Sequence, residues 1–437
     1  MSGAGVRGPW AARRVHRGLG SLALAGLIGL GVGGCGGTQA AHRATPSGTG
    51  AVSGTASPTT SADVPATVCL AATSQAPGYD GTDCMVAAPS LAGNLLGDQA
   101  SLLVRVLVPA GAGSGQASSG AQKSTSPEAS ASAGTSTSPG GRRYPVVYVL
   151  AGFQDSSTTL FDLMRGALPD DGTAPGVILV LVGGANALGG SFYANSPVSG
   201  HWEDAISQDL VRFVDGRFPT IPAAASRGIS GHSMGGSGAL NLALHRPDVF
   251  GVVYAMSPGL LDPDGEQQLF GDPTQVAHAL ADLAQLPSGS AAQRGAALSS
   301  VVSGEDGTQF AVAYGVAFAG DPSAPGLLRY PFHAGPGGTP VRDDAVWAQW
   351  AEGFGDLPGK LVRYRAALHA LRGIGVDYGT ADDYPWIPKG CHYFAGLLRG
   401  AGLPVQEATF VGDHQSQLGD RIVHHLLPFM VAHLAAR

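Results

Sequence analysis

The chain is poor in charged residues and in cysteine. Only 13% of its 437 residues are charged, acidic residues outnumber Lys and Arg by 32 to 25, and no basic cluster after residue 35 could neutralise a row of phosphates. Nucleic acid is therefore not an expected partner. The four cysteines form no C-x-x-C pair and no H-E-x-x-H segment occurs, so no metal site is expected. A small neutral substrate fits this composition better.

The first 35 residues have the pattern of an export signal. Four arginines and no acidic residue precede an apolar stretch over residues 19–32, and Val32-Gly33-Gly34-Cys35 follows. The stretch is short and glycine-rich for a membrane span, and small residues before a cysteine resemble the lipobox of bacterial lipoproteins. We expect residues 1–35 to be a signal peptide, Cys35 to be lipidated, and the chain to be held on the extracytoplasmic face of the membrane. An uncut transmembrane anchor is the alternative, and it places the remainder on the same side.

Two segments lack the large apolar side chains that a packed core needs. Residues 36–66 are almost wholly Gly, Ser, Thr, Ala and Pro and are predicted to be a tether, and residues 110–141 are predicted to be a low-complexity loop insert. The folded domain is then residues 67–437. Cys69 and Cys84 are the natural disulfide in an oxidising compartment. Cys391 is left over and is expected to be a buried thiol.

Unbroken apolar runs alternate with helical patterns in the second half of the domain. Residues 145–150 and 177–182 are typical of strands buried on both faces of a parallel sheet. Later strands are predicted to end near residue 230 and to cover residues 252–257, 373–378 and 405–411, with helices over 202–218, 235–245, 361–371, 392–400 and 418–434. This alternation predicts a three-layer α/β/α fold with a doubly wound, mostly parallel sheet, whose functional groups lie at the carboxyl ends of the strands.

Two regions depart from the alternation. The strands expected over residues 102–108 and 144–150 flank the low-complexity insert, and we expect them to pair antiparallel across it. Residues 262–359 are rich in Pro and Gly with irregular apolar spacing, and are predicted to be a partly helical insertion before the last strands. Their aromatic side chains could form a lid or an acyl groove, or could simply be packing residues.

A serine in the middle of the chain lies in a recognisable local pattern. Gly231-His232-Ser233-Met234-Gly235 fits G-x-S-x-G, in which the serine occupies a tight turn between a strand and a helix. A predicted strand precedes it and a predicted helix follows, and the N-terminus of that helix favours negative charge developing beside the serine. Ser233 is therefore the predicted nucleophile. His232 is expected to line or buttress the site, and Trp202 is a further candidate for lining it.

A serine hydroxyl needs a base, and the base needs an acid to orient it. His414 follows the last predicted strand and is the predicted base. Asp382 follows the preceding strand and is the predicted acid, with the adjacent Asp383 as the alternative, because sequence does not settle the register of a loop. The N–H groups of Met234 and Phe153 are the predicted oxyanion hole.

Six segments of residues 100–437 together carry a family resemblance: Tyr144-Pro145-Val146-Val147-Tyr148-Val149-Leu150-Ala151-Gly152, Ser191-Phe192-Tyr193, His201-Trp202-Glu203, Gly231-His232-Ser233-Met234-Gly235-Gly236, Gly379-Thr380-Ala381-Asp382 and Gly412-Asp413-His414. They resemble the secreted esterase family that includes the trehalose mycolyltransferases, and are also similar to the D-type esterases. The resemblance implies an α/β-hydrolase fold, small-molecule or lipid esters as substrates, a covalent acyl-enzyme and no cofactor. It also implies that Ser233, Asp382 and His414 take the triad positions.

The sequence departs from the mycolyltransferases where those enzymes bind sugar. The loop over residues 151–154 lacks their Asp before the glycine and their Arg after it, and Asn195-Ser196-Pro197 replaces an aromatic-rich segment. We therefore expect a serine esterase that hydrolyses carboxylic esters. Two alternatives stay open: an acyltransferase that uses an alcohol or sugar acceptor, and a non-catalytic envelope lipoprotein that keeps the fold and only binds.

Overall fold

The computed structural model describes residues 64–112, 141–169, 171–302 and 307–436. The predicted export signal, the lipidation site Cys35 and most of the tether and of the low-complexity insert lie outside these residues. Among the helices of the described ranges, none is both long and apolar enough to cross a membrane.

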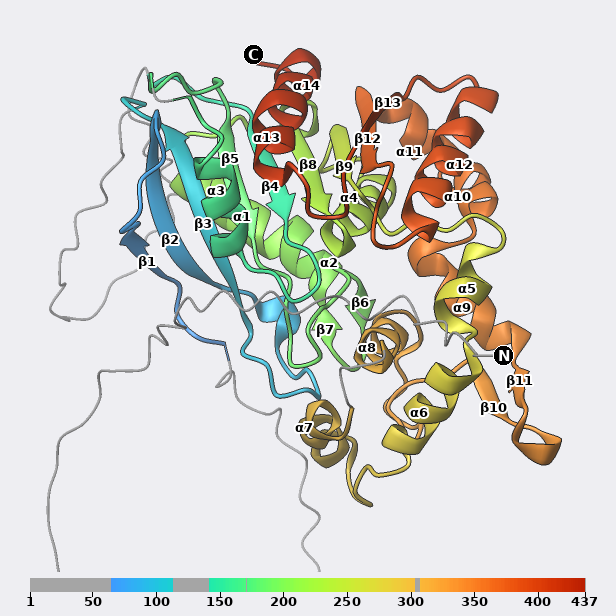
Figure 1. Ribbon diagram of the computed structural model, residues 1–437. Helices are drawn as coiled ribbons and strands as arrows, with labels where there is room; N and C mark the ends of the chain where they lie inside the picture. The colour runs from blue at the N-terminus through green and yellow to red at the C-terminus, as the bar shows by residue number, and fades with distance from the viewer. Residues whose placement is uncertain (1–63, 113–140, 170, 303–306, 437) are drawn as a thin grey trace, which may run out of the picture. The chain divides into compact units, whose positions relative to one another are not determined.

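A nine-stranded sheet forms the middle layer, in the order β1-β2-β3-β5-β4-β8-β9-β12-β13 (Figure 1). The pairs from β5 to β13 are all parallel, and those from β1 to β5 are antiparallel. The bounds are β1 (Val68–Ala71), β2 (Tyr79–Ala87), β3 (Ser101–Pro109), β4 (Val146–Leu150), β5 (Ile178–Val182), β8 (Arg227–His232), β9 (Val252–Met256), β12 (Gly373–Gly379) and β13 (Gln406–Phe410).

The expected pairing of the two strands that flank the insert is wrong. β5 lies between β3 and β4, antiparallel to β3 and parallel to β4. Every residue of β4 and β5 is buried, whereas Leu103 of β3 is 64% exposed. Two strands that are apolar on both faces belong side by side inside a parallel sheet. β3, which is exposed at Leu103, therefore pairs with β5 and does not pair with β4.

The two strands at the N-terminal edge of the sheet, β1 and β2, were not predicted, although the disulfide between them was. β1 and β2 pair antiparallel with Cys69 opposite Cys84, and the two cysteines are bonded with a Cα–Cα distance of 4.1 Å. β1 is short and exposed on most of its residues, so its pattern is too weak to recognise in sequence. The disulfide holds this edge strand to the sheet.

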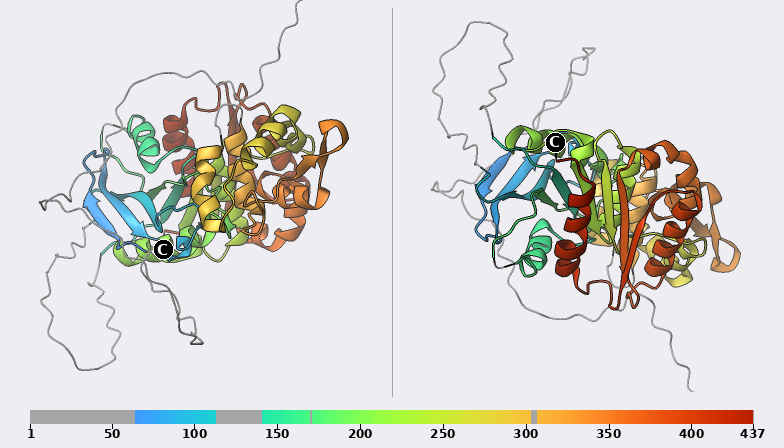
Figure 2. Two further views of the ribbon diagram at one scale, coloured as in Figure 1. Left: turned by 90° about the horizontal axis from the view of Figure 1, so that it is seen from below. Right: turned by 90° about the horizontal axis from the view of Figure 1, so that it is seen from above.

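Helices cover both faces of the sheet, which gives the predicted three-layer architecture (Figures 1 and 2). One face packs against α1 (Ser157–Arg165), α13 (Leu418–Arg421) and α14 (Leu427–His433). The other packs against α2 (Trp202–Asp204), α3 (Val211–Arg217), α4 (Met234–His245) and α12 (Trp386–Gly400). π-Helical turns over Ala205–Leu210 and Ile422–Leu426 join α2 to α3 and α13 to α14.

Residues 262–359 are mainly helical. Figure 1 shows α6, α7 and α8 beyond the carboxyl ends of the central strands. The helices are α5 (Gly265–Phe270), α6 (Pro273–Leu283), α7 (Ala291–Val301), α8 (Thr308–Ala319) and α9 (Asp344–Phe354), with a hairpin of β10 (Phe332–Ala334) and β11 (Pro340–Arg342); α10 (Leu357–Arg363) and α11 (Arg365–Ala370) then lead to β12. Trp350 and Tyr314 are buried here, and the Tyr314 hydroxyl donates to the Trp350 carbonyl at 2.7 Å. These two aromatic residues are core.

A buried ion pair ties the C-terminal helices to the sheet. Arg421 of α13 contacts Asp377 of β12 at 2.5 Å, and the two side chains are 2% and 3% exposed. Arg421 also donates to the Ser257 hydroxyl at 3.0 Å, and the Tyr254 hydroxyl donates to Asp377 at 3.0 Å. Because burying an unpaired charge costs several kcal/mol, the pair anchors α13, a four-residue helix that follows the His414 loop, to the sheet.

We predict that Arg421→Leu lowers the free energy of unfolding by about 3–5 kcal/mol, because it leaves the Asp377 carboxylate buried without its partner. Urea denaturation of the two proteins measures this. The matched control is Arg342→Leu, which breaks an exposed pair with Asp344 and should cost less than about 1 kcal/mol. Equal losses for the two variants would contradict the assigned role.

Candidate active site

Ser233 occupies a strained turn between β8 and α4. Its φ is +56° and its ψ −117°, a conformation that residues other than glycine rarely adopt. The glycines on either side make the turn possible: a Cβ on Gly231 would lie 2.3 Å from the Gly235 carbonyl oxygen, and one on Gly235 would lie 2.1 Å from that of Leu150. The Ser233 N–H donates to the Met256 carbonyl at 3.0 Å. The G-x-S-x-G spacing therefore has a steric cause in this fold.

His414 and Asp382 form a buried pair at the same edge of the sheet. His414 Nδ1 lies 2.9 Å from Asp382 Oδ2, and the side chains are 5% and 0% exposed. They are brought together because β12 and β13 are parallel neighbours, so the loops that follow these strands meet. Asp382 Oδ1 accepts the Tyr384 N–H at 2.9 Å, whereas Asp383 is exposed. The carboxylate accepts the Nδ1 proton, which leaves Nε2 with its lone pair.

The other nitrogen of His414 is free within the part of the chain that the structure describes. Nε2 is buried and has no hydrogen-bond partner among those residues. A histidine held at Nδ1 by a carboxylate, with an unpartnered Nε2, has the arrangement of a general base.

His232 joins this loop to the serine turn. Its ring is fully buried, Nε2 lies 3.0 Å from the carbonyl oxygen of His414, and the two rings are 4.6 Å apart. A carbonyl only accepts, so Nε2 carries the proton. Burial lowers the pKa of His232 well below 6.5, and the positive charges of His414 and Arg421 lower it further. A neutral His232 therefore buttresses the backbone of His414 from the position next to Ser233.

The loop that contains Phe153 is held on both sides of that residue. The Tyr193 hydroxyl donates to the Ala151 carbonyl at 2.9 Å, and the Gln154 N–H donates to the Gly189 carbonyl at 2.8 Å. The Phe153 N–H makes no backbone hydrogen bond to any described residue. Met234 opens α4, where N–H groups lack acceptors within the helix. Both predicted donors are thus in positions from which an N–H can be offered to a ligand.

Trp202 lies behind the loop. Its indole N–H donates to the Ser199 carbonyl at 3.0 Å, and its ring packs edge-on against Tyr193 at 6.5 Å. It is 4% exposed. Trp202 therefore supports the tyrosine that holds Ala151, and it acts on the site through that contact.

Asp155 is a site residue that the sequence analysis missed. Its carboxylate covers Gly152: a Cβ there would lie 2.8 Å from Asp155 Oδ2 and 3.5 Å from His232 Nδ1. Burial raises the pKa of Asp155, and the positive charge of His414 opposes that rise. Asp155 belongs to no recognised motif. The only indication in the sequence of its role is its position three residues after Gly152.

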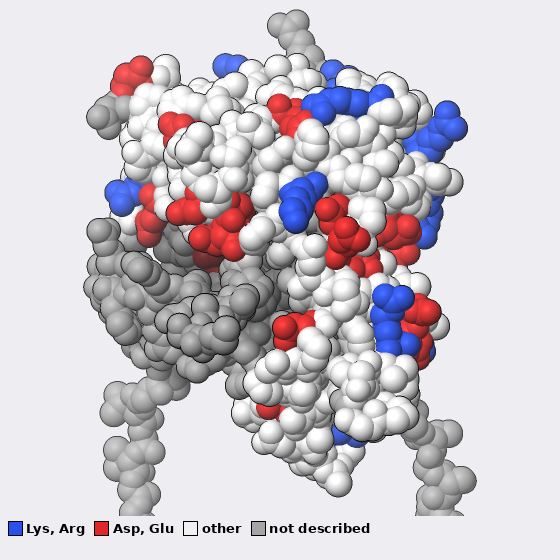
Figure 3. Space-filling model, turned by 45° about the vertical axis from the view of Figure 1, so that its right-hand side comes forward, with Lys and Arg blue, Asp and Glu red and all other residues white. Residues whose placement is uncertain are grey.

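Cys391 lies beside the groups described above, with its sulfur 3.7 Å from the Pro258 carbonyl oxygen. Cys391 is buried, as expected, and burial raises the pKa of its thiol well above the ordinary value. Within the described ranges no three His, Cys, Asp or Glu side chains gather in a way that could hold a metal ion. The face in Figure 3 is mostly uncharged, with acidic and basic side chains scattered over it.

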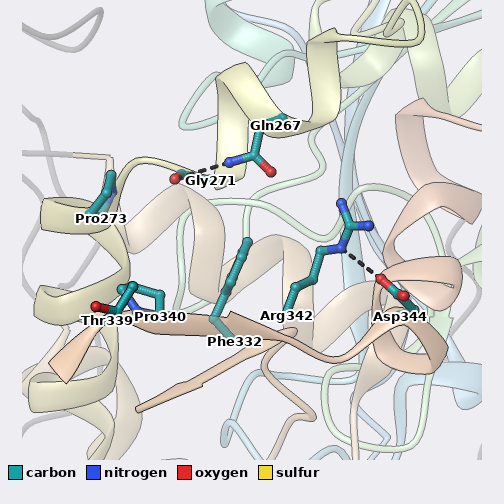
Figure 4. A pocket seen from close by; sticks show the side chains of 8 residues that line it. All are labelled: Gln267, Gly271, Pro273, Phe332, Thr339, Pro340, Arg342 and Asp344. Carbon is teal, nitrogen blue, oxygen red and sulfur yellow. Dashed lines mark hydrogen bonds and ion pairs between the residues drawn. The ribbon is translucent and has the colours of Figure 1, made fainter. Parts of the chain in front are cut away.

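A hollow of about 520 Å³ lies between α5, α6 and the β10–β11 hairpin (Figure 4). Arg342 on its wall is paired with Asp344 at 2.7 Å. It contains none of the predicted site residues; its lining is Gln267, Gly271, Pro273, Phe332, Thr339, Pro340, Arg342 and Asp344. The chemistry of Ser233 is not located there.

We predict that wild-type stability falls as the pH is lowered below 6.5, partly because of His232. Its folded-state pKa is below its unfolded-state value, so the unfolded chain binds a proton that the folded chain excludes. His232→Gln keeps the N–H donor without titrating, and should remove up to about 1.4 kcal/mol per pH unit from the slope. Urea denaturation across this pH range measures the slope. His425→Gln, at an exposed histidine, is the control and should change the slope less than His232→Gln does.

Residues 135–325 match the family model described as "Putative esterase". Among similar solved structures, the fluorophosphonate-binding serine hydrolase FphF of Staphylococcus aureus is 15% identical with a TM-score of 0.44, and the match covers 84% of this chain and 98% of that one. An S-formylglutathione hydrolase of Agrobacterium tumefaciens is 15% identical with a TM-score of 0.43, covering 85% and 100%. MPT51 of Mycobacterium tuberculosis is 16% identical with a TM-score of 0.44, covering 82% and 99%.

At these identities and TM-scores the solved structures say nothing about substrate. The family match is the stronger finding, since it covers the turn at Ser233 and ends before Asp382 and His414. It confirms, over residues 135–325, the resemblance to an esterase family that the motifs in that range indicated.

Proposed function

We propose that the chain is an exported, lipid-anchored serine esterase that hydrolyses carboxylic esters through Ser233, His414 and Asp382. The observation that carries the proposal is the buried His414, held by Asp382 at Nδ1 and by His232 at its carbonyl, with Nε2 left unpartnered. The esterase-family match supports the reaction class. The export signal and the cysteine at residue 35 support the location.

The proposed cycle has two halves. Ser233 Oγ attacks the ester carbonyl while His414 Nε2 takes its proton, and the Asp382 carboxylate stabilises the imidazolium that forms. The N–H groups of Met234 and Phe153 bind the oxyanion, each contributing about 3 kcal/mol to the transition state. The ester C–O bond then breaks, and the departing alkoxide takes the proton from His414. Water attacks the acyl-enzyme with His414 as base, which releases the acid and restores Ser233.

Hydrolysis is proposed over acyl transfer because water needs no acceptor subsite. An acyltransferase would use the same first half and differ only in the alcohol that attacks the acyl-enzyme. A non-catalytic binding protein would keep the fold with an unreactive Ser233. Reactivity at Ser233 and the fate of the acyl group therefore separate the three functions.

We predict that the purified protein is labelled by a fluorophosphonate, and that Ser233→Ala and His414→Ala are not, because labelling needs a serine activated by a base. Both variants should also lose ester hydrolysis by about 10³-fold or more in kcat. Gel fluorescence and p-nitrophenyl acetate turnover measure the two effects. Ser300→Ala, at an exposed serine of α7, is the control and should label like the wild type. A folded wild type that stays unlabelled would overturn the proposal in favour of a binding protein.

We predict that Asp382→Asn lowers kcat by about 10³–10⁴-fold, because an amide no longer holds His414 in the required tautomer. Asp383→Asn is the matched neighbour and should stay within about twofold of the wild type, because Asp383 is exposed. Steady-state kinetics with near-saturating ester distinguish them. A larger loss for Asp383→Asn would reverse the assignment of the acid.

A further inference from the structure

A continuous arc of aromatic side chains runs from the His414 loop to the Phe153 loop. Its members come from four separate segments of the chain, and each ring is in contact with the next. Ring centroids are 4.9 Å apart for His414–Tyr384, 6.1 Å for Tyr384–Trp386, 6.0 Å for Trp386–Phe354, 6.2 Å for Phe354–Phe310 and 5.1 Å for Phe310–Phe153. We call these five aromatic residues, from Tyr384 to Phe153, the aromatic arc.

The aromatic arc lies against the backbone that surrounds Ser233. The Phe354 ring packs on Gly259, where an added Cβ would come within 2.4 Å of it, and the Gly259 N–H lies 3.4 Å from the Ser233 carbonyl oxygen. The Phe153 ring packs on Gly190, where an added Cβ would lie 2.5 Å from both that ring and the Met234 sulfur. The rings therefore fill the space directly beside the serine turn.

The space behind the aromatic arc is filled as well. Phe192 packs edge-on against Phe310 at 5.2 Å and against Phe354 at 5.8 Å. Phe310 and Phe354 are 8% and 2% exposed. A long acyl chain directed at this wall would have to displace packed rings, and a densely packed interior resists this.

Phe310 is the member that closes the wall. It lies in the first turn of α8, which belongs to the helical insertion, and it bridges Phe153 to Phe354. The start of α8 is also tied to the Phe153 loop, because the Gln154 side-chain amide donates to Gln309 at 3.1 Å. Without the Phe310 ring, Phe153 and Phe354 would still be connected through Phe192, which lies 6.0 Å from the first and 5.8 Å from the second, but the space in front of Phe192 would be open.

We propose that the aromatic arc is the acyl-facing wall of the site, that it restricts the enzyme to esters of short acyl groups, and that Phe310 sets this limit. The inference rests on the proposed function. In an open apolar groove each added methylene of the acyl chain improves binding by about fourfold. Against a filled wall that gain is absent, and additional carbons reduce turnover.

The test is the acyl-chain profile of kcat/KM for p-nitrophenyl acetate, butyrate, octanoate and dodecanoate. For the wild type we expect the octanoate-to-butyrate ratio to be about 0.1 or lower, and Phe310→Ala to raise this ratio by about tenfold or more, because a ring-sized space opens. Phe318→Ala is the control: it removes a ring from the same helix and cluster, in contact with Phe192 and Tyr314 but outside the aromatic arc. Its ratio should equal that of the wild type. Phe310→Leu, which disturbs packing less, should lie between.

Each outcome decides the proposal. A wild-type profile that is flat or rises with chain length overturns it, and so does a Phe310→Ala ratio equal to that of Phe318→Ala. If Phe310→Ala fails to fold, the ratio for Phe310→Leu decides in its place. If the protein hydrolyses the acetate ester and is labelled at Ser233 but shows no chain-length limit, only this inference is refuted and the proposed function stands. A protein that neither hydrolyses nor labels loses the proposed function itself.

Discussion

The hydrogen bond from His232 to the carbonyl of His414 holds together the two segments on which the proposed chemistry depends. One is the strained turn at Ser233, and the other is the loop between β13 and α13. His232 is adjacent to Ser233. The hydrogen bond therefore fixes the position of His414 relative to the predicted nucleophile directly, and not only through the strands that carry the two residues. Because burial keeps His232 neutral, it has no charge with which to destabilise the imidazolium that His414 becomes during the reaction. The same burial means that the bond is shielded from water, where it would be weaker.

The rest of the structure supplies the rigidity that this bond needs. Arg421, paired with Asp377, is the last residue of α13, the short helix that follows the His414 loop, and Ser257, which accepts from Arg421, follows β9 beside the Ser233 turn. One buried guanidinium thus donates hydrogen bonds to groups from two segments that surround the site, β12 and the residue that follows β9. A loop tethered at one end only would move on the timescale of loop motion. Here the loop between β13 and α13 is fixed at its histidine and again at Arg421, so the base is preorganised before substrate arrives.

The order of strands and helices after residue 144, and the positions of Ser233, Asp382 and His414 after strands of the sheet, were predictable because they depend on local patterns. Buried runs such as residues 145–150 mark parallel strands, and a serine turn with small neighbours has a specific spacing. The predictions that failed concern features that are decided by tertiary packing, which a local sequence pattern does not encode. The pairing of β3 with β5 rather than β4 is decided by which strand buries both faces, and the exposed edge strand β1 carries no periodic signal. Asp155 escaped notice because a carboxylate after a loop glycine looks like an ordinary turn residue. The choice between Asp382 and Asp383 required the loop register, which only the packing of β12 against β13 supplies.

The insertion shows how one framework can carry different specificities. The sheet and its loops provide the serine, histidine and carboxylate, whereas two of the rings in the aromatic arc, Phe310 and Phe354, come from the helices of residues 262–359. Within the described residues, those helices contact the Phe153 loop through apolar rings and the exposed Gln154–Gln309 bond. Apolar contacts are non-directional, so a change in ring size there alters the shape of the site without disturbing the hydrogen bonds that orient His414. Under the two proposals made above, substrate range and chemical reactivity are controlled by different parts of the chain, and a substitution in α8 changes the first while leaving the second intact.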